Sequence, residues 1–369
     1  MKGTTMRTFV FAMALFWLQV AARADGLRVE SFNGAGRLTF NEIPTATVYR
    51  VESAPAPDGS WTVASNGLGA ITATGTGSVT CSVPMDVARQ FYRVVATVTN
   101  AVSPGAPSGQ VLIPFGISTG TDPDAGAYSL TNDAAFYMDT HEVTKALWDV
   151  VKNWSDSNGY AYDNIGSGKG TNHPVQGINW YDCVKWCNAR SQRDGLTPVY
   201  YTDAGCTQIY KSGQVAEPCV SNSATGYRLP TDVEWQYAAR GGVANRRFPW
   251  DDTDTIQHTR ANYLSQSIDP PAYDTSVTRG YHPTYKTGIT PYTSPVGAFE
   301  PNDYGIYDMA GNVSEWCYDW YPSYEGVKRT VHGGSWGSPN ASFCRVDQRD
   351  LAKPTFVSDS YGFRTVRKP

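Results

Sequence analysis

Short runs of alternating apolar and polar residues dominate the chain between positions 26 and 98. The runs include LRVESF, RLTF and TVYRVESA, are rich in β-branched or aromatic residues, and are bounded by Gly, Pro, Asn or Asp. A period of two with such boundaries is typical of strands that bury one face. The pattern therefore predicts a small antiparallel β-sandwich over residues 25–98. A stretch rich in Ser, Pro and Gly at residues 99–110 indicates a linker.

One segment of the remaining domain, residues 111–369, carries a clear helix signal. In GYRLPTDVEWQYAARGG, Thr231 can cap the first turn, and Glu234 can complete the capping box. Gly241 supplies a C-terminal stop. These signals predict a helix over residues 232–240.

Two weaker helical patterns precede this segment, at residues 142–154 and 180–190. In the second pattern the apolar face contains Trp180, and we expect Lys185 and Asn188 to point outward. Elsewhere Gly, Pro, Asn and aromatic residues alternate at short range. The domain is therefore expected to consist largely of loops held on a small sheet.

The start of the chain has the form of an export signal. Lys2 and Arg7 precede an apolar run at residues 9–18, and the triplet ARA at residues 22–24 has the small-x-small form that signal peptidase cleaves. A membrane anchor is the alternative, but the run is only about half of the roughly 20 residues that cross a bilayer. We expect residues 1–24 to be removed and the protein to be secreted, periplasmic or at the cell surface, without a membrane span.

Composition and charge narrow the class of protein further. The formal net charge is -4 over 369 residues and no basic stripe is present, which argues against nucleic acid as a partner. Aromatic residues make up 13% of the chain and 35 residues are Gly, a combination typical of a compact, loop-rich fold. In an exported protein the seven cysteines can form disulfides, and their odd number leaves at least one thiol unpaired within the chain.

Beyond residue 110 the chain carries a series of long motifs in a fixed order. They are FYMDTHEVT, HPVQGINWYD, GYRLPTDVEWQYAARGG, RFPW, SPVGAFEPNDYGIYDMAGNVSEWCYDWY, GGSW and the terminal YGFR. In this order they resemble the formylglycine-generating enzyme family, also called sulfatase-modifying factors. The resemblance implies an α+β, C-type-lectin-like domain with little regular secondary structure at residues 111–369. The β-sandwich predicted before it resembles, through YRVESAPAPDGSW and FYRV, a fibronectin type III-like module.

The motif YGIYDMAGNVSEWCYDWY places two carboxylates, Asp308 and Glu315, among aromatic and apolar residues. Leaving them unpaired there would cost several kcal/mol. Ca²⁺ takes oxygen ligands and would satisfy them, whereas hydrogen bonds from backbone amides and Trp N–H groups are the alternative. In the family that the chain resembles, this stretch holds a structural calcium. The resemblance implies as ligands the side chains of Asp308 and Glu315 with the carbonyls of Gly311 and Val313.

A second calcium of that family lies at a stretch that resembles ANY in this chain. Asn262 and the Tyr263 carbonyl match its ligands, but residues 287–293 lack the acid that is expected before SPV. Asp269 or Asp274 could replace that acid as the remaining ligand.

The segment VHGGSWGSPNASFCRVDQRD departs from the family at the position of its chemistry. Catalytically competent members carry two cysteines five positions apart after GGS, which bind copper(I) and use oxygen to convert a sulfatase cysteine to formylglycine. Ser338 and Phe343 stand at these positions, and Cys344 lies one place further on. One thiol cannot form a two-coordinate thiolate site, so copper is not expected as a cofactor. Cys344 and Ser338 are the remaining candidates for a catalytic role.

Four of the cysteines suggest two disulfides. Cys206 and Cys219 lie in a loop that looks inserted before GYRLP, and Cys317 and Cys344 lie in the two motif regions. We pair them in that way, because the compartment is oxidising and a disulfide that closes a loop of about 15 residues contributes on the order of 3 kcal/mol. This pairing makes Cys344 a structural half-cystine rather than a nucleophile.

Three functions are compatible with these features. We favour an exported member of the family that lacks the copper-dependent oxidase activity and serves as a calcium-stabilised ligand-binding domain. The first alternative is an enzyme that oxidises or otherwise modifies sulfatase-type cysteine substrates, and the second is a diversified lectin-like display protein. The ligand in the favoured hypothesis is a peptide, a glycan or a sulfatase-type protein, bound around Ser335, Trp336, Ser338, Asn340 and Arg345.

Overall fold

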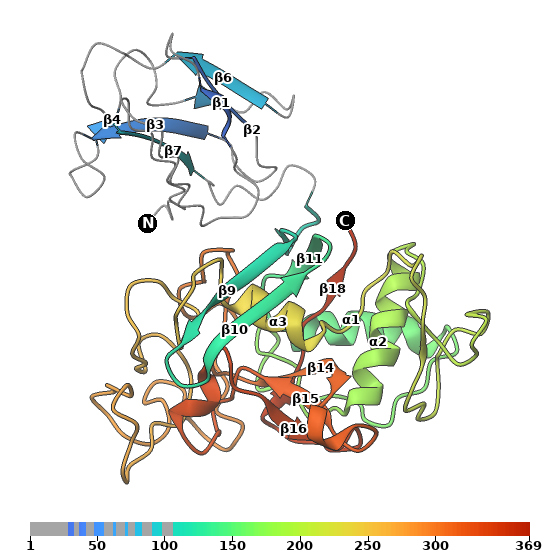
Figure 1. The fold of residues 1–369 in the computed structure, drawn as a ribbon. Helices are drawn as coiled ribbons and strands as arrows, with labels where there is room; N and C mark the ends of the chain where they lie inside the picture. Colours follow the sequence, from blue (N-terminus) through green and yellow to red (C-terminus); the bar gives the residue numbers. More distant parts are fainter. Residues whose placement is uncertain are drawn as a thin grey trace. The chain divides into compact units, whose positions relative to one another are not determined.

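The computed structural model describes residues 106–369 throughout and, before them, only the strands β1–β7 (Figure 1). The chain divides into two compact units, Met1–Pro104 and Gly105–Pro369. The expected export signal, residues 1–24, lies outside the described residues. None of the helices that the structure describes has the length and apolar character needed to span a bilayer.

The N-terminal unit contains two antiparallel sheets. In one, β2 pairs with β1 and β6, and in the other, β3 pairs with β4, β5 and β7. Antiparallel strands are therefore present as predicted, whereas the sandwich packing and the fibronectin type III-like module stay predictions. The strands are β1 (Val29–Phe32), β2 (Arg37–Asn41), β3 (Val48–Ala54), β4 (Thr62–Val63), β5 (Ile71–Thr72), β6 (Ser78–Ser82) and β7 (Phe91–Thr97).

The C-terminal unit combines small sheets with long loops, as expected for this α+β fold. A three-stranded sheet has the order β18-β11-β8, and a four-stranded sheet has the order β16-β15-β14-β17, in which β17 runs parallel to β14. Strands β9 and β10 form a long hairpin, and β12 pairs with β13. The strands are β8 (Gln110–Ile113), β9 (Gly116–Asp122), β10 (Gly126–Asn132), β11 (Phe136–Asp139), β12 (Tyr200–Tyr201), β13 (Cys219–Val220), β14 (Ser314–Trp320), β15 (Arg329–His332), β16 (Asp350–Ala352), β17 (Tyr361–Gly362) and β18 (Val366–Arg367).

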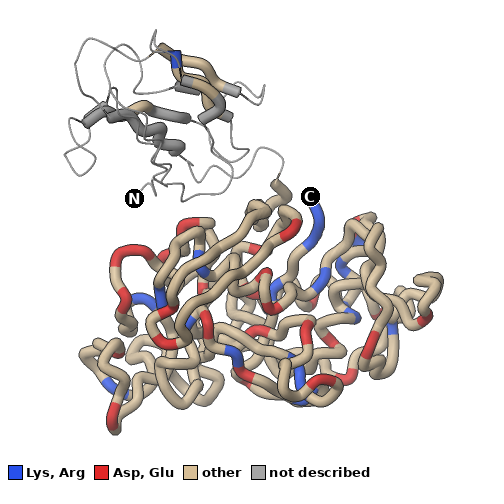
Figure 2. Tube along the Cα trace, in the orientation of Figure 1, with Lys and Arg blue, Asp and Glu red and all other residues tan. Residues whose placement is uncertain are grey.

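All three predicted helices are present. Helix α3 (Asp232–Ala239) has the capping box between Thr231 and Glu234. Helix α1 (Lys145–Asp156) begins later than predicted because Thr144 caps it, and α2 (Trp180–Arg193) continues one turn beyond the prediction. Two short 3₁₀ helices complete the unit, η1 (Pro322–Tyr324) and η2 (Ala341–Cys344). Acidic and basic positions are interspersed along this unit without a stripe of one sign (Figure 2).

Large aromatic side chains fill the core between α1, α2 and the four-stranded sheet. Trp148 of α1 and Trp186 of α2 stack with ring centroids 5.8 Å apart, and Phe363 meets both rings edge-on. All three side chains are fully buried. Such rings supply much apolar area per residue, which allows a core to form around few regular elements. Figure 1 shows α1 and α2 side by side, and α3 packs separately against β10.

The predicted orientation of Lys185 and Asn188 on α2 is wrong, because both side chains are fully buried. The ammonium of Lys185 lies 3.2 Å from a carboxylate oxygen of Asp163. The side-chain amide of Asn188 donates to the carbonyls of Tyr200 and Tyr210, and its oxygen accepts from the N–H groups of residues 199 and 200. Periodicity assigned these polar residues to solvent, but loops cover this face of α2 and need partners for their backbone groups.

Replacing Asn188 with Ala is expected to destabilise the protein by about 3 kcal/mol, because buried backbone donors and acceptors of the covering loop would lose their partners. Urea unfolding monitored by tryptophan fluorescence measures the change. Asn172→Ala is the control, because residue 172 is exposed. Equal stability of the two variants would contradict this account of the loop.

Candidate functional site

Two glycines allow three chain segments to meet at the candidate site. Gly311 has a φ of +87°, and a Cβ there would lie 2.4 Å from the carbonyl oxygen of Asn262. Gly334 has a φ of +66°, and a Cβ there would lie 2.9 Å from the backbone of Phe343. A larger residue at either position would push the backbones apart. Close backbone approach therefore joins the ANY motif to AGN and the GGSW motif to the segment of Phe343, and the Gly311 N–H donates to the Gly333 carbonyl at 2.8 Å, which links the two pairs.

Asn312 connects these segments through hydrogen bonds in four directions. Its backbone N–H donates to the Asn262 carbonyl at 2.8 Å, and its carbonyl accepts from the Trp336 N–H at 2.9 Å. Its side-chain oxygen accepts from the Ser294 N–H at 2.9 Å, and its side-chain nitrogen donates to Glu142 at 3.1 Å. Sequence reasoning assigned this asparagine no role in the site. Asn312 has a positive φ of 62°, a left-handed backbone conformation in which its backbone groups and its side chain all reach these partners.

Glu315, a predicted calcium ligand, is held by protein donors. Arg364, from the terminal YGFR motif, donates to both carboxylate oxygens at 2.7 and 2.6 Å. The indole N–H of Trp235, on α3, donates to one of these oxygens at 2.8 Å. Since the glutamate and the arginine are both buried, these contacts replace the water that each charge has lost. The hydrogen-bonded alternative thus describes this carboxylate, with an arginine as an additional partner.

Asp308 is buried but only partly satisfied. One carboxylate oxygen accepts from the Gly297 N–H at 2.7 Å, whereas the other has no hydrogen-bond partner among the described residues. Burial raises the pKa of Asp308 to about 6, and the nearby Glu315 carboxylate adds to that effect. Glu142 is buried beside them, and burial together with the two neighbouring carboxylates raises its pKa well above its usual range. Sequence reasoning missed Glu142, although it stands in the FYMDTHEVT motif.

The group offers oxygen donors for an ion without a cluster of acidic side chains. Within residues 106–369 and the described strands, no three His, Cys, Asp or Glu side chains gather to hold a metal. Calcium sites can, however, be built largely from backbone carbonyls, and a buried acceptor without a partner is what an ion would satisfy. The free oxygen of Asp308 meets this requirement, and so does the unpartnered side-chain oxygen of Asn262. The residues therefore fit an ion at Asp308, with the carbonyls of Gly311 and Val313 as the other expected ligands.

Two of the ligands considered for a second ion, the Tyr263 carbonyl and Asp274, are engaged by protein groups, whereas the side-chain oxygen of Asn262 has no partner among the described residues. The Tyr263 carbonyl accepts a hydrogen bond from Nε2 of His258 at 3.2 Å. Asp274 accepts a 2.6 Å hydrogen bond from the Tyr263 hydroxyl and pairs with Arg279 at 3.2 Å. Asp269, the other candidate acid, is exposed. Protein donors thus satisfy Tyr263 and Asp274, and the second calcium site stays a prediction.

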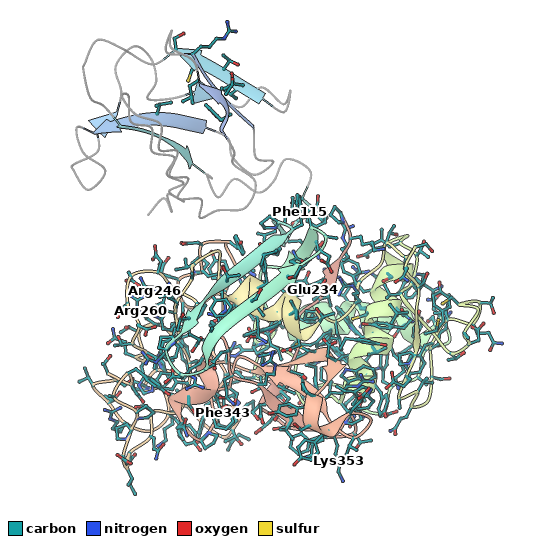
Figure 3. All side chains as sticks on the ribbon, viewed as in Figure 1. Phe115, Glu234, Arg246, Arg260, Phe343 and Lys353 are labelled. Carbon is teal, nitrogen blue, oxygen red and sulfur yellow. The ribbon has the colours of Figure 1, made fainter. Side chains whose placement is uncertain are left out.

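The candidate catalytic residues do not form a thiolate pair. Cys344 is fully buried at the end of η2, and burial raises the pKa of its thiol far above its usual range. The hydroxyl oxygen of Ser338 accepts from the Ser335 N–H at 2.9 Å, and the two hydroxyls lie 3.1 Å apart. Figure 3 labels Phe343, which is half-buried on the segment that follows β15. The positions of the expected thiols are therefore filled by a hydroxyl and an aromatic ring.

The remaining predicted ligand-binding residues, Trp336, Asn340 and Arg345, also have structural partners. The side-chain oxygen of Asn340 caps η2 by accepting from the N–H of residue 342 at 2.8 Å. Arg345 pairs with Asp124 at 3.3 Å and with Asp347 at 3.2 Å. The indole N–H of Trp336 donates to a carbonyl at 3.1 Å, which fixes the orientation of its ring. Of the predicted set, Trp336 alone joins an aromatic cluster that continues beyond the GGSW motif.

The structure brings one predicted cysteine pair together. The sulfur atoms of Cys206 and Cys219 lie 2.7 Å apart, although the structure has the cysteines as free thiols. Cys317 packs in the apolar cluster on α3, whereas Cys344 packs in a separate cluster of loop residues. The positions of the latter two side chains therefore give no support to their predicted pairing.

Comparison with known proteins defines the class. The family model described as the sulfatase-modifying factor enzyme 1-like domain matches residues 97–369, and the chain belongs to this family. It is similar to the chaperone protein LppX of Paenibacillus barcinonensis, with 33% identity over 239 residues that cover 63% of this chain and 80% of the relative. The formylglycine-generating enzyme of Mus musculus is 28% identical over 312 residues, which cover 72% of this chain and 77% of the enzyme.

Other relatives extend this picture. The Bos taurus protein named inactive C-alpha-formylglycine-generating enzyme 2 is 39% identical over 145 residues, which cover 38% of this chain and 43% of that protein. Among solved structures, CarF matches with a TM-score of 0.56 and 27% identity, covering 71% of this chain and 99% of CarF. Variable protein 1 of Treponema denticola has a TM-score of 0.52 at 24% identity, covers 70% of this chain and 95% of its own, and shares the fold.

Replacing Arg364 with Met is expected to cost about 3–5 kcal/mol of stability, because it leaves the Glu315 carboxylate buried without its countercharge. Arg260→Met is the matched control, since Arg260 pairs with an exposed aspartate at the surface and should contribute less than about 1 kcal/mol. Arg260 is labelled in Figure 3. Thermal and urea unfolding of both variants measure the difference, and similar losses would contradict the importance of the buried pair.

Proposed function

We propose that this chain is a member of the sulfatase-modifying factor family that lacks the copper-dependent cysteine oxidase reaction and acts, after export, as a ligand-binding domain. The missing thiol pair is the observation that carries the proposal. Ser338 and Phe343 stand where the family's two cysteines are expected, and the neighbouring Cys344 is buried among apolar residues.

The physical argument concerns the ligands that copper(I) requires. This soft ion prefers thiolate sulfur, and a serine hydroxyl is a hard and weak donor for it. A thiol binds metal only after losing its proton, and burial raises the pKa of Cys344 so that the proton is retained. Neither Ser338 nor Cys344 alone can therefore supply the two-coordinate site on which the oxidase reaction depends.

The names of two relatives support a role other than oxidation. One is called a chaperone and the other an inactive formylglycine-generating enzyme. The similarity to the mouse formylglycine-generating enzyme instead favours the alternative, in which this chain is an oxidase that acts on sulfatase-type cysteines. The missing thiol pair of this chain supports the first of these two functions, and we infer that the fold is used for binding a partner.

The test substrate is a sulfatase-type peptide of the sequence CxPxR, in which x is any residue. Incubation of the mature protein with copper, oxygen and this peptide is expected to give no formylglycine product in mass spectrometry. The double variant Ser338→Cys, Phe343→Cys should gain copper(I) affinity, since it restores thiols at both family positions. Ser338→Cys alone serves as the control with one restored position. Product formation by the unaltered protein would overturn the proposal.

We also propose that a structural calcium ion completes the group around Asp308. Glu142, Asp308 and Glu315 are three buried carboxylates, whereas Arg364 is the one guanidinium that the described contacts bring to them. When all are ionised, two negative charges lack compensation, and a divalent cation would supply it. The ion would lower the free energy of the folded state without taking part in chemistry.

Calcium at about a hundredfold excess over its dissociation constant is expected to stabilise the metal-free protein by about 2.7 kcal/mol, measured by calorimetry. Burial holds the pKa of Asp308 at about 6, so its ionised form destabilises the metal-free fold above that pH. Stabilisation by calcium should therefore be larger at about pH 7.5 than at about pH 5. Asp308→Asn should remove most of the stabilisation by calcium. Asp133→Asn is the control, because residue 133 is exposed, and this variant should be stabilised as much as the unaltered protein. An unchanged response of Asp308→Asn to calcium would disprove this site.

A further inference from the structure

An aromatic cluster of Tyr281, Tyr292 and Trp336 lies beside the GGSW segment. The ring centroids of the two tyrosines are 5.0 Å apart, and the Trp336 ring lies 5.7 Å from Tyr281 and 5.3 Å from Tyr292. Trp336 is buried, while both tyrosines are half-buried. Because the cluster joins the loop of residues 281–292 to a segment that sequence reasoning assigned to ligand binding, it marks the part of the domain where a partner can make contact.

Two lysines give this cluster a positive charge. The ammonium of Lys169 lies over the Tyr292 ring at 5.3 Å, and that of Lys286 lies over the Tyr281 ring at 5.6 Å. In the described part of the chain neither ammonium has a carboxylate within ion-pair distance, whereas Lys145 and Lys152 do. Lys169 donates to carbonyls of residues 287 and 291 at 2.8 and 3.0 Å and thereby shapes the loop.

The exposed part of this surface combines charge with apolar area. Lys286 is exposed, and Ile289, three residues further along the same loop, is 86% exposed. One face of each of the Tyr281 and Tyr292 rings already has an ammonium above it, which disfavours stacking of a sugar ring on that face. A loop that exposes both an ammonium without a countercharge and an aliphatic side chain is complementary to a chain segment with carboxylate and apolar side chains.

We propose that the exposed loop with Lys286 and Ile289, which packs on Trp336 through the half-buried Tyr281 and Tyr292, binds an acidic, partly apolar peptide segment of a partner protein. This inference rests on the proposed ligand-binding function and specifies its ligand. The same two lysines disfavour the CxPxR motif, because its arginine would bring a like charge to an uncompensated cation.

Fluorescence anisotropy with the mature protein tests the proposal, using a labelled peptide that alternates Glu and Leu, its Gln-for-Glu counterpart, and a CxPxR peptide. The acidic peptide is expected to bind at least about tenfold more tightly than the other two, and more weakly as salt is added. Lys286→Glu should remove this preference. Lys328→Glu is the matched control, because Lys328 also lies over a tyrosine ring, at 4.6 Å, but precedes β15, whereas Trp336 follows it.

Equal binding of the Glu and Gln peptides, or an unchanged preference in Lys286→Glu, would overturn the assignment. A sulfated polysaccharide that binds more tightly than the acidic peptide at the same salt concentration would also overturn it, and would make the ligand a glycan. Either result would leave the proposed lack of oxidase activity unaffected, because only the formation of formylglycine would contradict that proposal.

Discussion

The buried ion pair between Glu315 and Arg364 is the constraint on which the C-terminal domain depends. Two charges removed from water must be compensated at short range, and the protein does this by bringing the last segment of the chain to β14 and by aiming the Trp235 indole at the same carboxylate. A further contact of Arg364 with the carbonyl of residue 307 ties in the Asp308 loop. The C-terminal segment of the domain is thus fixed to its centre by one guanidinium.

How well the sequence predicted each element depends on whether the decisive contact is local. The limits of α3 were predicted almost to the residue, because the capping box between Thr231 and Glu234 spans three positions. The burial of Lys185 and Asn188 was missed because Asp163 and the loop at residues 199–210 lie far from them along the chain. A helical periodicity reports which face is polar, and it cannot report that a loop covers that face.

The same distinction applies to the candidate site. The absence of the thiol pair could be read directly from Ser338 and Phe343, since it is a matter of residue identity at motif positions. Arg345 was assigned to ligand binding, yet it pairs with Asp124 from the β9–β10 hairpin, which no spacing rule connects to it. Asn312 was underestimated for a related reason, because its partners come from four separate segments.

Ser338 and Phe343, which stand where the family's cysteines are expected, contribute few contacts to the framework. Ser338 bonds locally to Ser335, and Phe343 is half-buried, so neither takes part in the contacts around Glu315 or Asn312. Replacing reactive groups that sit outside such a network removes the chemistry at small cost in stability. The loop that carries Lys286 is held by Lys169 and by the ring of Trp336, so its position depends on neither the Ser338 nor the Phe343 side chain.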